Sequence, residues 1–119
     1  MVVVKWLKNP QKHAYPVAES YLRLIFKPQA ATTAAENLES VKITATRAKD
    51  KFRTSGVSLL GVSNSHVEKD QARVILSECS PLLLFRDTSR AKLISADGYQ
   101  RLCAVHTFDV DAMIPCRIV

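Results

Sequence analysis

The sequence Leu93-Ile94-Ser95-Ala96-Asp97-Gly98-Tyr99-Gln100-Arg101-Leu102-Cys103-Ala104 carries the clearest structural signal in the chain. It predicts a short strand that runs through an Asp-Gly turn directly into a helix over residues 99–108. The N–H groups of Gly98, Tyr99 and Gln100 would then lie at the positive end of the helix dipole, with Arg101 one turn further on. This arrangement favours binding of an anion, phosphate above all.

A helix cap is the alternative explanation of the same stretch. Asp97 and Gln100 have the spacing of a capping box, in which the carboxylate accepts a hydrogen bond from the Gln100 N–H and the amide side chain reaches back. A carboxylate at this place also repels phosphate. In a functional site Asp97 therefore needs another task, and we consider it a candidate catalytic residue that holds Mg²⁺ or takes a proton.

The segments around this stretch alternate between helical and extended patterns. Helices are expected over residues 16–26, 30–39, 46–54 and 66–76, with Gly56 as a left-handed residue after the third. Strands are expected at 2–6, 41–44, 81–85, 92–96 and 113–119, and residues 57–62 form a further apolar segment. This order predicts an α+β domain in which helices pack around a small mixed sheet.

The length of 119 residues predicts one domain, residues 1–119, and an apolar content of 47% is sufficient for a core. We expect a mainly helical, basic part at 1–56 and a second part at 57–119. No apolar run is long enough for a membrane span and the N-terminus lacks signal-peptide features, so we expect a cytoplasmic protein without a membrane partner. Cys79, Cys103 and Cys116 form no C-x-x-C pair and are expected to be buried, reduced thiols.

The net charge of +6 lies entirely in residues 1–54, which contain 10 Lys and Arg against 4 Asp and Glu. This excess indicates either a solvated helix face or a surface for nucleic acid or an acidic protein partner. The histidines do not have metal-ligand spacing, and no metal site is expected. The basic residues are densest in one segment, where the candidate nucleic-acid-binding residues are Lys42, Arg47, Lys49, Lys51 and Arg53.

Residues 57–119 resemble the ParB/sulfiredoxin superfamily. The resemblance is carried by a proline-led strand at 80–85 (SPLLLF), a strand at 93–96 (LISA), a glycine-containing turn ending in arginine at 97–101 (DGYQR) and a closing strand at 114–119 (IPCRIV). Residues 13–22 (HAYPVAESYL) and 96–104 (ADGYQRLCA) are similar to small stand-alone bacterial ParB-like proteins of unknown function. In their version of the second motif, a histidine stands at the position of Gln100.

The resemblance implies a ParB N-terminal-domain or sulfiredoxin-like fold and a nucleotide or phosphate site. Sulfinic-acid reduction is not implied, because Tyr99 stands in place of the reactive cysteine of sulfiredoxins. If the chain is an enzyme, a phosphohydrolase or phosphotransferase acting on a nucleotide is implied, with Mg²⁺ accompanying the ligand. The alternative is a non-enzymatic interaction module, accessory or antitoxin-like, that keeps the fold. The residues implied in ligand binding are Gly98, Tyr99, Gln100, Arg101, Asn64 and His66.

Overall fold

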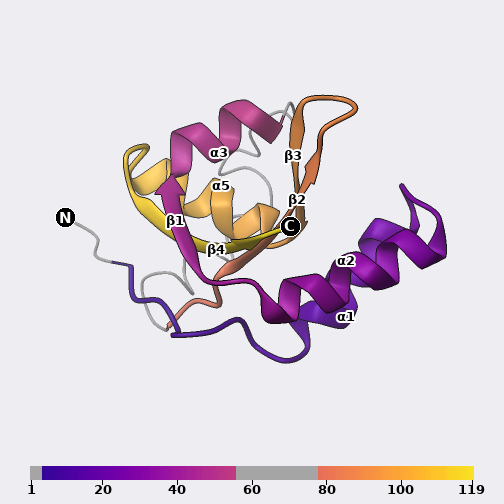
Figure 1. Cartoon of the computed structure of the whole chain (residues 1–119). Helices are drawn as coiled ribbons and strands as arrows, with labels where there is room; N and C mark the ends of the chain where they lie inside the picture. The colour runs from indigo at the N-terminus through magenta and orange to yellow at the C-terminus, as the bar shows by residue number, and fades with distance from the viewer. Residues whose placement is uncertain (1–3, 56–77) are drawn as a thin grey trace.

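The computed structural model describes residues 4–55 and 78–119, and Figure 1 shows their arrangement. The predicted helix at 66–76, the apolar segment at 57–62 and the position of Gly56 lie outside the described residues. The elements in chain order are α1 (Ala14–Arg23), α2 (Pro28–Ser40), β1 (Thr44–Arg47), α3 (Ala48–Ser55), β2 (Leu82–Asp87), β3 (Lys92–Asp97), α5 (Tyr99–Phe108) and β4 (Met113–Ile118).

Most predicted elements are confirmed within a few residues, and α5 begins at Tyr99 and ends at Phe108 as expected. The strand predicted at 41–44 is wrong in position, because β1 covers Thr44–Arg47. Its register is set by β4, where Thr44 lies opposite Cys116 and Arg47 lies opposite Met113. Of the strand predicted at 2–6, the described part contributes an isolated parallel bridge between Trp6 and Cys79.

The four described strands form one sheet in the order β1-β4-β2-β3. β4 pairs antiparallel with β1 and parallel with β2, while β2 and β3 form an antiparallel pair. The sheet is therefore mixed, and the α+β class expected from the element order is confirmed. β1 and β3 are the two edge strands.

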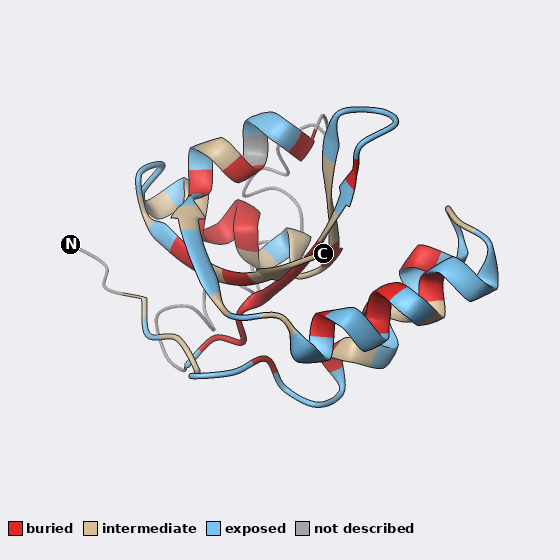
Figure 2. Ribbon diagram, in the orientation of Figure 1, coloured by how far each residue is buried: buried red, intermediate tan, exposed pale blue. Residues whose placement is uncertain are grey.

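Two hydrophobic cores lie on opposite faces of the sheet, because successive side chains of a strand point to opposite sides. Leu82 and Leu84 of β2 pack with the buried residues of α5, whereas Leu83 packs with the α1–α2 hairpin. Phe26 at the end of that hairpin meets Phe85, with ring centroids 4.9 Å apart. Figure 2 shows buried residues along the sheet, in α5 and in the α1–α2 hairpin, and exposed residues in the β2–β3 loop.

The three cysteines are buried thiols outside any disulfide bond, as expected from their spacing. In the part of the chain that the structure describes, no helix has the length and apolar character that a membrane crossing requires.

Candidate functional site

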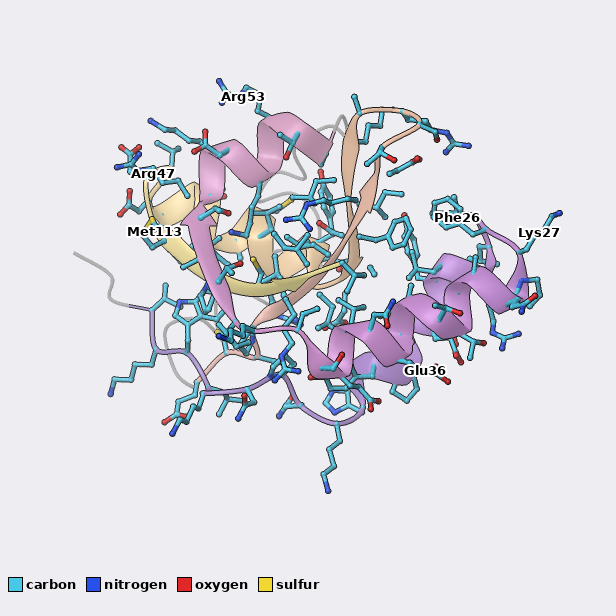
Figure 3. The ribbon with its side chains drawn as sticks, viewed as in Figure 1. Phe26, Lys27, Glu36, Arg47, Arg53 and Met113 are labelled. Atoms are coloured by element: carbon cyan, nitrogen blue, oxygen red, sulfur yellow. The ribbon has the colours of Figure 1, made fainter. Side chains whose placement is uncertain are left out.

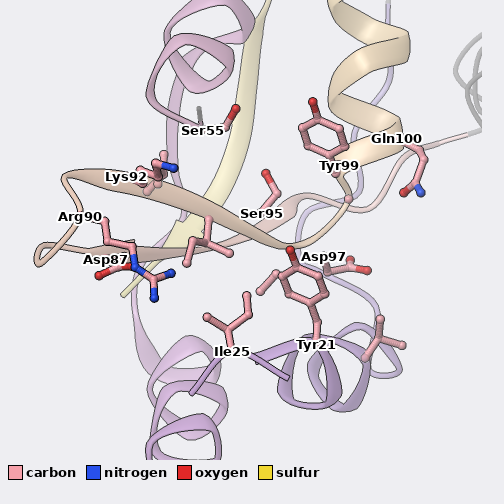
Figure 4. A pocket seen from close by; sticks show the side chains of 15 residues that line it. Tyr21, Ile25, Ser55, Asp87, Arg90, Lys92, Ser95, Asp97, Tyr99 and Gln100 are labelled. Carbon is pink, nitrogen blue, oxygen red and sulfur yellow. The ribbon is translucent and has the colours of Figure 1, made fainter. Parts of the chain in front are cut away.

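A cavity of about 460 Å³ lies along β3, between α1 on one side and the ends of α3 and α5 on the other (Figure 4). It meets the turn that the sequence singles out, because residues 97–100 form one end of its wall. The other lining side chains come from α1 (Val17, Tyr21) and the turn that follows it (Ile25), from α3 (Ser55) and from the β2–β3 hairpin (Asp87, Arg90 and residues 92–96).

Gly98 shapes the turn at the end of β3. Its φ of +102° lies in the left-handed region, which side chains other than that of glycine rarely adopt. A Cβ at this position would lie 2.8 Å from Nη2 of Arg101 and 2.9 Å from Cγ of Leu82. Two residues earlier, Ala96 has no partner in β2, because Leu83 pairs with Asp97 and Leu84 with Ser95. This β-bulge and Gly98 together redirect the chain from the strand into α5.

The capping box predicted from Asp97 and Gln100 is wrong. No side chain caps α5, because the left-handed Gly98 occupies the cap position and the carboxylate is held elsewhere. Oδ2 of Asp97 instead accepts a hydrogen bond of 2.8 Å from Nη2 of Arg101. The two side chains are only 15% and 22% exposed, and Nε of Arg101 is buried without a hydrogen-bond partner among residues 4–55 and 78–119.

The structure brings together part of the predicted ligand site. Asp97, Gly98, Tyr99 and Gln100 line the cavity, whereas the described lining residues do not include Arg101. Arg101 lies directly behind the turn, packed over Gly98 and paired with Asp97. The predicted neighbours at positions 64 and 66 lie outside the described residues.

Tyr99 contributes a neutral phenol to the cavity wall. Burial raises the pKa of Tyr99 above its ordinary value of 10, and the neighbouring Cys103 thiol, to which Tyr99 is hydrogen bonded, raises it further. The phenol therefore stays protonated at neutral pH and adds no negative charge beside the turn.

The opposite end of the cavity contains two cationic side chains, Arg90 and Lys92. Arg90 is paired with the carboxylate of Asp87. Asp87 is buried, and its Oδ2 lies 3.6 Å from Nε of Arg90. Its Oδ1 accepts a hydrogen bond of 2.6 Å from Oγ of Ser89. Lys92, the first residue of β3, is exposed and forms no ion pair within residues 4–55 and 78–119. Neither Lys92 nor the α1 residue Tyr21 was a sequence-based candidate, because nothing local in the sequence connects them with the turn.

The basic segment at 42–53 does not form one surface. Lys51 is only 2% exposed, and its ammonium donates hydrogen bonds to the carbonyl of Ile114 at 2.9 Å, to the carbonyl of Thr46 at 3.0 Å and to the Thr46 hydroxyl. The prediction that Lys51 binds nucleic acid is therefore wrong, because its side chain is buried and donates a hydrogen bond to the Ile114 carbonyl of β4.

Two more basic side chains of this segment form ion pairs with carboxylates. Lys49 pairs with Asp111 at 2.7 Å, and Arg53 pairs with Asp50 at 3.2 Å. Arg47 and Arg53 point outward from β1 and α3 (Figure 3). Lys42 is also exposed, so Lys42 and Arg47 are the two that form no ion pair in the described part of the chain.

The described residues contain no group of three or more histidine, cysteine or carboxylate side chains that could hold a metal ion. Asp97 is the carboxylate nearest the turn, and one of its oxygens is already held by Arg101. A Mg²⁺ ion here would therefore need most of its ligands from the phosphates of a nucleotide and from water.

Fold and site together define a mixed α+β structure with a cavity along the edge strand β3, next to a strand-to-helix turn. Comparison of the chain with protein-family models, with curated proteins and with solved structures gives no match.

Proposed function

We propose that this protein binds a phosphate-containing ligand, in the first instance a nucleotide, in the cavity at the start of α5. The observation that carries the proposal is that the cavity opens on residues 97–100, where α5 begins without a side-chain cap. A ten-residue helix presents partial positive charge and N–H groups at this end. The cavity volume of about 460 Å³ falls within the range of small-molecule sites.

The charge balance at the turn also supports an anion site. Arg101 lies 2.8 Å from Asp97 and offsets its negative charge, and both side chains are largely buried, where solvent screens the pair less. Asp97 therefore repels a phosphate less than an isolated carboxylate would. In this proposal Arg101 is a positioning residue that neutralises Asp97 and holds it beside Gly98.

The wall contributed by α1 suits the nucleoside part of the ligand. Tyr21 and Ile25 face β3 across the cavity, and Figure 4 shows the Tyr21 ring next to Asp97. An aromatic ring in this place can stack on a base. A phosphohydrolase or phosphotransferase reaction would use Asp97 as the base, with Mg²⁺ entering on the nucleotide phosphates. Binding without turnover needs only the turn and the wall.

We also propose that the chain is related to ParB-like domains. The support for this relationship is the order of elements after residue 81, in which a strand led by Pro81, a second strand, the Gly98 turn, a helix and a closing strand follow one another.

The test is a thermal-shift titration with CTP, ATP, GTP and inorganic phosphate, each with and without Mg²⁺. A ligand at about 100 times its dissociation constant adds about 2.7 kcal/mol, or roughly 10 °C in Tm for a chain of this size. We expect one nucleotide to stabilise the protein, Arg101→Ala to abolish this shift, and Arg53→Ala to retain it. Arg53 is a matched control, because it also pairs with a carboxylate a few residues earlier in the chain but does not line the cavity. Absence of any shift with all phosphate ligands would overturn the proposal.

Nucleic-acid binding through residues 42–53 has less support, because Lys51 is buried and Lys49 and Arg53 are paired with carboxylates. The interaction-module alternative is favoured by a different observation, the open edge of β3, which the next subsection develops.

A further inference from the structure

β3 is an edge strand whose outer side pairs with no other strand of the sheet. In the part of the chain that the structure describes, residues 92–97 make no backbone hydrogen bond outside their ladder with β2. An edge strand of this kind presents a row of N–H and C=O groups that another extended chain can pair with.

The cavity follows this edge rather than one face of the sheet. All six residues of β3 line it, and consecutive residues of a strand point to opposite faces. Ile94 packs on the α1 side and Leu93 on the α5 side, so a cavity that touches both lies against the strand's edge. Figure 4 agrees, because Tyr21 and Ile25 lie on one side of the strand and Ser55 and Tyr99 on the other.

The length of the open edge limits the length of a bound segment. The bulge at Ala96 interrupts the regular ladder and leaves Lys92–Ser95, four residues that span about 13 Å. Gly98 and α5 close the far end. The edge therefore suits a segment of about four or five extended residues rather than a long strand.

Charge and polarity define the side chains of that segment. Lys92 is exposed and has no ion pair within the described ranges, whereas Arg90 at the same end is occupied by Asp87 at 3.6 Å. A side chain opposite Lys92 is therefore acidic. Ile94 points to the same face of the strand as Lys92, so a side chain opposite Ile94 meets Tyr21 and Ile25 and is therefore apolar.

We propose that the edge of β3 binds an extended peptide with an acidic residue opposite Lys92 and an apolar residue opposite Ile94, by adding a strand to the sheet. The inference does not depend on nucleotide binding, because the peptide uses residues 92–95 and the phosphate uses residues 98–100. Both ligands share the cavity, so a bound peptide and a bound nucleotide would compete for its volume.

The probe is a capped pentapeptide, Glu-Thr-Val-Thr-Glu, which offers a glutamate to Lys92 in either strand direction and places its valine opposite Ile94, on the face of Tyr21 and Ile25. Two matched peptides accompany it, one with alternate backbone nitrogens methylated and one with lysines in place of the glutamates. Binding is followed by amide NMR shifts and by hydrogen exchange of the β3 amides, without nucleotide, at up to about 1 mM peptide. We expect the glutamate peptide to slow exchange in residues 92–95 and the methylated peptide to leave it unchanged.

Variants of the protein test the proposed orientation. Lys92→Glu should weaken the glutamate peptide about fivefold or more and should make the lysine peptide the better ligand. Tyr21→Ala should weaken binding, whereas Leu24→Ala should not, because Leu24 is 84% exposed and does not line the cavity.

Three outcomes would overturn the inference. Equal binding of the methylated peptide would mean that the backbone edge is not used. Unchanged β3 exchange at the highest peptide concentration would mean that no strand is added. A concentration-dependent dimer with protected β3 amides in the absence of peptide would assign the edge to a second copy of the chain.

Discussion

Lys51 and Arg101 are both largely buried basic side chains, yet their hydrogen-bond partners differ in charge. Lys51 donates hydrogen bonds to neutral groups, namely the carbonyls of Thr46 and Ile114 and the Thr46 hydroxyl. Arg101 is held by the carboxylate of Asp97 at 2.8 Å, and its buried Nε has no hydrogen-bond partner in the described part of the chain. The three donors of Lys51 are thus matched by three acceptors, whereas Arg101 keeps unused hydrogen-bonding capacity.

The difference separates a structural cation from a candidate functional one. Lys51 ties the start of α3 to β4 and leaves nothing for a ligand to bind. Arg101 lies behind a turn that opens on a cavity, and its partner Asp97 lines that cavity. A charged side chain near a predicted motif is therefore a site candidate only where its hydrogen bonds are incomplete and a cavity is adjacent.

Replacement of Lys51 should have the largest effect on stability. Lys51→Met keeps the aliphatic volume but leaves the buried carbonyl of Ile114 and the Thr46 groups without a donor, at a cost of about 3 kcal/mol. Urea unfolding measures this change. Lys49→Met is the control, because Lys49 is half exposed and its surface ion pair with Asp111 is worth about 0–1 kcal/mol. Equal effects of the two substitutions would contradict the structural role of Lys51.

Gly98→Ala should have the second largest effect, a loss of about 2 kcal/mol, because the left-handed φ of +102° is strained for alanine. The added Cβ would also press on Leu82 and Arg101. Ala91→Gly is the control with the opposite expected sign, since Ala91 already has a φ of +54°. This substitution should raise the free energy of unfolding by about 0.5 kcal/mol. Thermal unfolding of both variants should give shifts of opposite sign.

The Asp97–Arg101 pair should show a coupling of about 1 kcal/mol in a double-mutant cycle built from Asp97→Asn and Arg101→Met. The exposed pair of Asp50 and Arg53, at 3.2 Å, provides the comparison and should couple by only a few tenths of a kcal/mol. A coupling at Asp97–Arg101 no larger than at Asp50–Arg53 would remove the electrostatic argument for the anion site.

The smallest effect concerns pH. Burial lowers the pKa of Lys51 from its ordinary value of 10.5, although the neighbouring Cys116 thiol opposes the shift. The folded chain therefore loses this proton at a pH where the unfolded chain still binds it, so the contribution of Lys51 to stability rises with pH up to about 10.5. The difference in free energy of unfolding between the natural protein and Lys51→Met should widen from pH 8 to pH 10.5. A difference that narrows would contradict the direction of the shift.

Local signals in the sequence predicted most of the described fold. The Asp97-Gly98 pair marks the end of β3, and Pro81 marks the start of β2, so the strand–turn–helix unit could be found without tertiary information. β1 was misplaced by three residues because its four residues carry a weak pattern and its register comes from pairing with Cys116 and Met113. Non-local pairing of this kind leaves no trace in a short window of sequence.

The candidate site was predicted only in part for the same reason. The turn residues were found because they adjoin one another, whereas Tyr21 and Lys92 reach the cavity from separate elements. The capping box failed because a side chain four residues on, Arg101, competes for the same carboxylate. The role of Lys51 depends on the carbonyl of Ile114, 63 residues further along the chain.

The position of β4 inside the sheet has a consequence for how this chain folds during its synthesis. β4 follows every other described strand in the sequence, yet it lies between β1 and β2, which do not pair with each other. During synthesis, β1 and the β2–β3 hairpin leave the ribosome before the strand that joins them. Closing the sheet then requires contacts such as that between Thr44 and Cys116, 72 residues apart, and distant contacts form slowly. Until β4 emerges, the nascent chain exposes unpaired strand edges that a chaperone can protect from aggregation.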